Sequence, residues 1–141
     1  MSALDTQVGG SHYKRYAIQP FEFALVNGYD AGTAYILKHV TRHQDKLGRE
    51  DLEKSIHYVE MRQEVFSRYN TAHFRPYEPI IPMAKYIKEN QIGRREAVIC
   101  DMLDLWMRFP ASVEYPEKLK RKLAELADAL YPVTPTESPT P

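Results

Sequence analysis

Three basic residues at four-residue spacing, Lys38, Arg42 and Lys46, are the strongest candidates for chemistry in this sequence. Four residues advance an α-helix by about 400°, so the three side chains would return to nearly the same face. Guanidinium and ammonium groups gathered in this way bind phosphate oxygens well. The row therefore indicates a site for a phosphate-bearing ligand. The solvated face of an amphipathic helix would have the same spacing, and the sequence leaves both interpretations open.

A second polar segment follows the break at Leu47-Gly48 and carries Asp51, Lys54 and Tyr58 along one stripe of an expected helix. Two helices joined by a tight turn would direct this stripe and the basic row toward a shared edge. Asp51 has two interpretations there. It could orient a ligand or a neighbouring lysine, or it could simply stabilise the helix start through the macrodipole.

Other patterns argue against several familiar kinds of site. His39 and His43 are four residues apart, which can chelate a metal, but no H-E-x-x-H motif is present and exposed polar side chains are the favoured interpretation. No metal ligand is predicted. No P-loop motif occurs. Glu125 and Asp128 supply only half of the paired-carboxylate pattern of an all-α nucleotide pyrophosphohydrolase. Cys100 lies in an apolar run and is expected to be a buried, inert thiol.

Length and charge narrow the class of protein. The chain has 141 residues and a formal net charge of zero, so nucleic acid is not expected as a partner. No apolar stretch approaches the roughly 20 residues of a membrane span. A single cysteine excludes an internal disulfide and suits a reducing compartment. We therefore expect a cytoplasmic protein that does not enter a membrane.

Apolar periodicity and helix-end signals predict an all-α fold of two small three-helix units. The helices are expected at about residues 20–26, 31–44, 49–69, 81–90, 94–108 and 116–130. The corresponding divisions are a mobile N-terminus at 1–8, a first unit with the candidate ligand site at 9–69, a linker at 70–80, a second unit at 81–131 and a disordered Pro-rich tail at 132–141.

The two predicted units also match each other at a fixed offset. Asn90 lies 63 residues after Asn27, and the same offset pairs Ile18 with Ile81 and other apolar positions. A divergent internal repeat would produce this match, and so would chance between two amphipathic helix triplets. The basic row is not repeated in the second half, so the first unit is expected to carry the chemistry.

Four short segments and one single residue between residues 9 and 60 together form one further pattern. They are Gly9-Gly10-Ser11-His12-Tyr13-Lys14, Ile18-Gln19-Pro20-Phe21-Glu22-Phe23, Lys38-His39-Val40-Thr41-Arg42, Lys46 and Asp51-Leu52-Glu53-Lys54. Together they resemble a small domain family that is widespread in tailed bacteriophages. One branch of that family is a podophage nucleotide kinase that lacks a Walker A motif. This chain has His39 where the family usually has tyrosine.

The resemblance implies roles for individual residues. The catalytic candidates, which would hold phosphates, neutralise charge or orient the reacting groups, are Lys38, Arg42 and Asp51. The candidates for nucleotide or phosphate binding are His12, Tyr13, Lys14, Lys46, Lys54 and Tyr58. A nucleoside triphosphate would serve as phosphate donor, and Mg²⁺ is compatible with this chemistry although no motif requires it.

The leading interpretation is a phage-encoded nucleotide-binding protein that acts as a deoxynucleoside-monophosphate kinase in the cytoplasm of an infected bacterial host. The first alternative is a non-catalytic module that binds a nucleotide or a host protein, and the second is an all-α nucleotide pyrophosphohydrolase. A homo-oligomer is expected, because small units bury little core and the chain holds ten tyrosines and five phenylalanines.

Overall fold

The structure is a computed structural model that describes residues 2–5, 16–70 and 76–134. Every regular element in these ranges is helical, which confirms the predicted all-α class, and none of their helices has the length and apolar character to cross a membrane. The α-helices are α1 (Pro20–Val26), α2 (Ala31–Arg42), α3 (Arg49–Tyr69), α4 (Met83–Glu89), α5 (Arg94–Arg108) and α6 (Glu114–Leu130). The 3-10 helices are η1 (Ala3–Asp5), within the segment expected to be mobile, and η2 (His43–Asp45).

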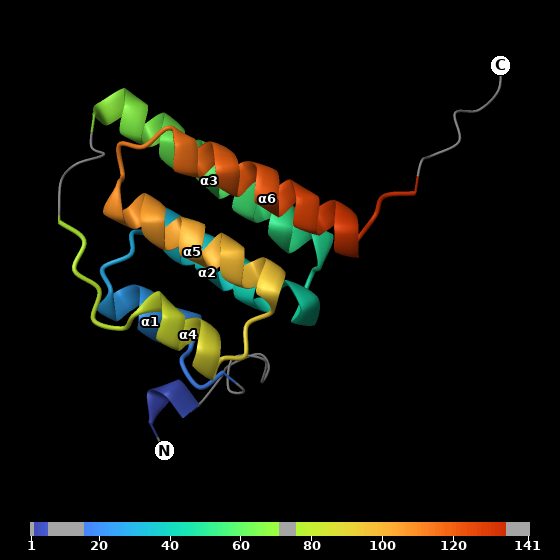
Figure 1. Cartoon of the computed structure of the whole chain (residues 1–141), viewed down its shortest axis with the longest axis horizontal. Coiled ribbons are helices and arrows are strands. Elements are labelled where there is room, and N and C mark those ends of the chain that lie inside the picture. Colours follow the sequence, from blue (N-terminus) through green and yellow to red (C-terminus); the bar gives the residue numbers. More distant parts are fainter. Residues whose placement is uncertain (1, 6–15, 71–75, 135–141) are drawn as a thin grey trace.

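The six α-helices stack as three layers of paired helices (Figure 1). α1 lies beside α4, α2 beside α5 and α3 beside α6, so each layer takes one helix from each half of the chain. In the first layer, the rings of Phe23 and Tyr86 lie 4.7 Å apart. One cluster of buried apolar side chains joins both halves, with Ile36, Leu37, Leu52, Val59, Ile99, Leu103, Trp106, Leu119 and Leu123 among its members. The halves therefore share a core.

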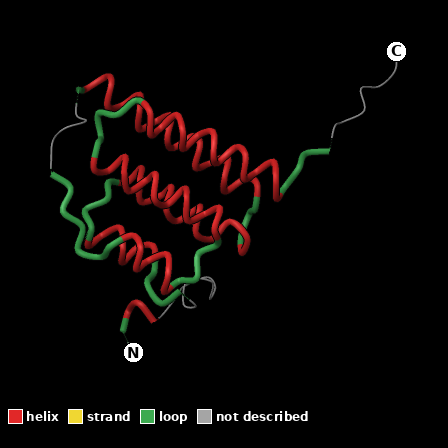
Figure 2. The backbone as a smooth tube through the Cα atoms, viewed as in Figure 1, coloured by secondary structure: helices red, strands yellow, loops and turns green. Residues whose placement is uncertain are grey.

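Local signals explain the starts of α1 and α2. Pro20 occupies the first position of α1, where its missing N–H has no partner to lose. Asp30 caps α2 by accepting a hydrogen bond from the N–H of Thr33 at 2.9 Å. The loops between these short elements are visible in Figure 2.

The predicted end of the second helix is wrong. α2 stops at Arg42 rather than residue 44, and the chain turns through η2 instead. The C=O of His43 accepts a hydrogen bond from the N–H of Gly48 at 2.9 Å, which closes the turn. Gly48 has φ +58°, and a Cβ at this position would lie 3.0 Å from the ring of Tyr131. Lys46 therefore follows the helix end and is not part of a continuous helical row.

Two asparagine amides connect the halves reciprocally. Asn27, just after α1, accepts hydrogen bonds from the N–H groups of Ile80 and Ile81 and donates one to the C=O of Ile81. Asn90, just after α4, accepts from the N–H of Ile18 at 2.9 Å and donates to its C=O at 2.7 Å. Residues matched at the predicted offset thus make matching contacts. An internal repeat would produce this reciprocity, and the repeat itself stays a prediction.

Replacing Asn27 with alanine should destabilise the fold. The variant loses three hydrogen bonds and leaves the N–H groups of Ile80 and Ile81 without their acceptor. We expect the free energy of unfolding to fall by about 1–3 kcal/mol. Urea unfolding followed by circular dichroism measures this, with Gln44→Ala at an exposed position as the control. Equal stabilities of the two variants would contradict the assigned role.

Candidate functional site

Side chains from the end of α2 and the start of α3 form what we call the cationic edge: Lys38, Arg42, Asp51 and Lys54. Nη2 of Arg42 lies 3.8 Å from Oδ1 of Asp51. Asp51 is fully buried, whereas Lys38 and Arg42 are half-buried and Lys54 is exposed. The structure thus brings together four of the residues that the sequence singled out.

The charges of this edge act on one another. The pKa of Lys38 lies below its ordinary value, chiefly because burial disfavours the ammonium ion and secondly because Arg42 is close. Lys54 lowers the pKa of Lys38 further, while Asp51 raises it. Three cations therefore lie near the buried carboxylate of Asp51, and Lys54 also pairs with Glu50 at 4.0 Å. The positive charge that remains attracts an anion.

Asp51 supports the start of α3, as one of its two interpretations expected, and its role toward a ligand stays a prediction. Its Oδ2 accepts a hydrogen bond from the N–H of Leu47 at 3.3 Å, which supports the start of α3. Its Oδ1 is buried and makes no hydrogen bond to any residue that the structure describes. Arg42 and His39 lie 3.8 Å and 3.9 Å from this oxygen, slightly farther than a hydrogen bond reaches. Arg42 is the cationic neighbour that this buried carboxylate needs, because an unpaired charge in the interior is costly.

His39 is buried, so its interpretation as an exposed polar residue is wrong. Its Nδ1 lies 2.6 Å from the C=O of Tyr35. A carbonyl can only accept, so Nδ1 carries the hydrogen and Nε2 of the neutral ring is an acceptor. Nε2 lies 3.9 Å from Oδ1 of Asp51. Two acceptors therefore face each other, and a hydrogen donor between them would satisfy both.

His43 is also buried, contrary to the prediction from the sequence, and is directed away from the cationic edge. Its Nδ1 lies 2.8 Å from the hydroxyl of Tyr131 and its Nε2 lies 2.9 Å from Glu96. Both partners come from the second half of the chain. Among the described residues, no three His, Cys, Asp or Glu side chains gather as metal ligands. His43 is thus a structural link between η2, α5 and the end of α6.

The remaining predicted site residues have different places. Tyr58 stacks on Tyr35 with ring centroids 4.9 Å apart, and its ring lies 5.8 Å from that of His39. Lys46 is exposed on the turn, and no ion pair joins it to a residue that the structure describes. Three further candidates, His12, Tyr13 and Lys14, fall outside the described ranges.

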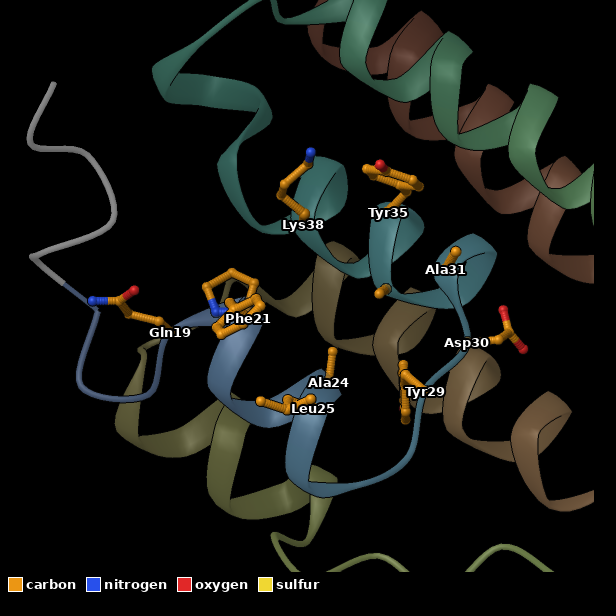
Figure 3. Close-up of a pocket in the computed structure, with 11 residues that line it drawn as sticks. Gln19, Phe21, Ala24, Leu25, Tyr29, Asp30, Ala31, Tyr35 and Lys38 are labelled. Atoms are coloured by element: carbon orange, nitrogen blue, oxygen red, sulfur yellow. The ribbon is translucent and has the colours of Figure 1, made fainter. Parts of the chain in front are cut away.

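A pocket of about 420 Å³ opens between α1 and α2, next to the cationic edge. Figure 3 shows Phe21, Ala24 and Leu25 on the α1 side and Tyr35 and Lys38 on the α2 side. We call it the α1–α2 pocket. Its walls are mainly apolar, and Nζ of Lys38 lies 4.5 Å from the centroid of the Tyr35 ring.

Sequence reasoning missed this pocket, although a signal existed. Phe21 and Leu25 are four residues apart on α1 and are 68% and 66% exposed. Both lie off the buried stripe that Phe23 and Ala24 define, and large apolar side chains left together in water often mark a binding surface. No protein-family model, curated protein sequence or solved structure matches this chain. The candidate site therefore depends on its geometry alone.

The pKa of His39 should respond in opposite directions to two substitutions. Burial and the cations Lys38 and Arg42 hold this pKa below its ordinary value, and Asp51 opposes them. Lys38→Gln removes a cation and should raise the pKa of His39. Asp51→Asn removes the opposing negative charge and should lower it. Long-range ¹H–¹⁵N NMR of the imidazole across a pH titration measures both.

The same spectra report the tautomer, which should carry its hydrogen on Nδ1. Lys85→Gln, an exposed position on α4, is the matched control and should leave the pKa unchanged. Shifts of the same sign in both test variants, or a hydrogen on Nε2 of the neutral ring, would contradict this assignment.

Proposed function

We propose that this protein binds a nucleoside monophosphate at the cationic edge and transfers a phosphoryl group to it from a nucleoside triphosphate. The observation that carries the proposal is the place of Lys38, which belongs both to the cationic edge and to the wall of the α1–α2 pocket. A ligand that joins a phosphate to a flat ring would engage both regions at once. Nucleotides have this form.

The cationic edge suits the needs of phosphoryl transfer. Enzymes of this kind work mainly by positioning the reacting groups and by neutralising charge on the phosphate oxygens. In our proposal Lys38 and Lys54 contact the phosphates, and Arg42 contributes its charge. Asp51 is a positioning residue, because its burial leaves it in contact with Arg42 rather than with solvent.

A magnesium ion fits this proposal only if it is bound mainly by the phosphates of the nucleotide. The described residues supply no group of three metal ligands, so they do not form a protein cage for the ion. Mg²⁺ commonly keeps several waters and binds substrate phosphates. In that role it would add charge neutralisation during phosphoryl transfer.

A hydrolase is the second candidate, and one observation favours it. Nε2 of His39 and Oδ1 of Asp51 are two facing acceptors, 3.9 Å apart. Both side chains are buried, so a water molecule could donate a hydrogen to each only after the end of α2 opened to solvent. That water would then be polarised for attack on a phosphate, as in general-base catalysis. This arrangement would serve an all-α nucleotide pyrophosphohydrolase, which uses water in place of a second nucleotide.

An activity assay separates these possibilities. Purified protein is incubated with each deoxynucleoside monophosphate or triphosphate, with and without a separate triphosphate donor and Mg²⁺, and products are resolved by ion exchange. We expect diphosphate that depends on the donor. Lys38→Gln should reduce its formation about 10- to 100-fold, because a charged contact to phosphate is lost. Lys85→Gln is the matched control.

Each other outcome of this assay points to a different function. Release of phosphate or pyrophosphate without a donor would replace the kinase with the hydrolase. Nucleotide binding in calorimetry without any product would indicate a binding module. Folded protein that neither binds nor converts any nucleotide would overturn the proposal and leave a host protein as the partner to seek.

A further inference from the structure

We infer that the α1–α2 pocket holds the base and sugar of the nucleotide and accepts different bases with little discrimination. This inference rests on the proposed function, because it assumes that the phosphate of the same ligand lies on the cationic edge. It adds a binding site on α1, a helix to which the sequence assigned no ligand role, and it states how selective that site is.

The size and lining of the pocket suit a flat, partly apolar group. Its volume of about 420 Å³ lies within the range of small-molecule sites. Phe21 and Leu25 leave about two thirds of their surface in solvent, at 68% and 66%. A ring laid against them would remove this apolar surface from water, and a base stacked on an aromatic side chain gains about 1–3 kcal/mol.

The opposite wall fixes how the ligand would be oriented. Tyr35 and Lys38 line it, one turn apart on α2. Tyr35 stacks on Tyr58, which limits its motion, and the Lys38 ammonium lies over the Tyr35 ring. In this position the ammonium also interacts electrostatically with Arg42, Asp51 and Lys54. A ligand with its ring in the pocket would thus have its anionic end beside Lys38.

Three polar side chains that line the pocket, Gln19, Tyr29 and Asp30, already make hydrogen bonds within the protein, which is why we infer weak discrimination among bases. Asp30 accepts hydrogen bonds from the N–H of Thr33 and from the guanidinium of Arg62. The side-chain amide of Gln19 donates to the C=O of Leu4. Strong discrimination requires polar groups that pair with one base and are left unpaired by another. Stacking tolerates every base, because each presents a π-face.

The test is isothermal calorimetry with three probes: dAMP, dTMP and inorganic pyrophosphate, which has phosphates and no base. The test variant is Phe21→Ala, and the control is Phe109→Ala, which removes another exposed phenylalanine. Phe21→Ala should weaken dAMP and dTMP about 5- to 100-fold and leave pyrophosphate unchanged. Wild-type protein should bind dAMP and dTMP with affinities within about tenfold of each other.

A second variant protects the test against small effects. Ala31→Trp adds a large ring to an exposed position that lines the pocket, so it should exclude both nucleotides and still bind pyrophosphate. Phosphate binding by the cationic edge is reported separately by Lys38→Gln, which should weaken all three probes.

These measurements distinguish a failure of the inference about the pocket from a failure of the proposed function. If Phe21→Ala and Ala31→Trp bind nucleotides as wild type does while Lys38→Gln does not, the base lies elsewhere and the inference is overturned, although the proposed function stands. A strong preference for one base would overturn the claim of weak discrimination. If the wild-type protein binds none of the three probes, the proposed function and this inference are overturned together.

Discussion

The buried carboxylate of Asp51 is the constraint on which the candidate site depends. It lies in the first turn of α3 without exposure to solvent, and a charge in that position has to be balanced by its surroundings. The guanidinium of Arg42 and the N–H of Leu47 are the groups that balance it, and the neutral ring of His39 lies beside them. These groups come from the last turns of α2 and from the link to α3. The need to balance one negative charge therefore constrains how the last turn of α2 meets the start of α3, beside the apolar packing of the same helices.

The second half of the chain supports this site without contributing a candidate ligand contact. His43 follows α2 directly and is held by Glu96 from α5 and by Tyr131 from the end of α6. Arg49, at the start of α3, donates to the C=O of Tyr131 at 3.0 Å and pairs with Asp128 at 2.9 Å. The turn that presents the cationic edge is thus braced on both sides by residues distant in sequence.

The sequence predicted the parts of the fold that depend on local signals. Helix starts at Pro20 and Asp30 were found because caps and proline act on their own neighbours. The end of α2 and the burial of both histidines were not, because they depend on partners such as Glu96, 53 residues from His43. The spacing of the four residues of the cationic edge led us to expect that they would lie near one another, and their role toward a ligand stays a prediction. The α1–α2 pocket was missed because its lining includes exposed apolar side chains, which periodicity assigns to no core.

The reciprocal asparagine links have a consequence for how the chain folds. They join residues 54 and 72 positions apart, and their donors and acceptors are backbone groups of the opposite half. Most helical proteins fold quickly because their contacts are local, whereas contacts of this separation require long loops to close first. Each of the short helices α1 and α4 is therefore followed by an asparagine that forms its hydrogen bonds only after the other half of the chain has docked. We expect this protein to fold more slowly than simple helical bundles of its length, with the two halves docking in the rate-limiting step.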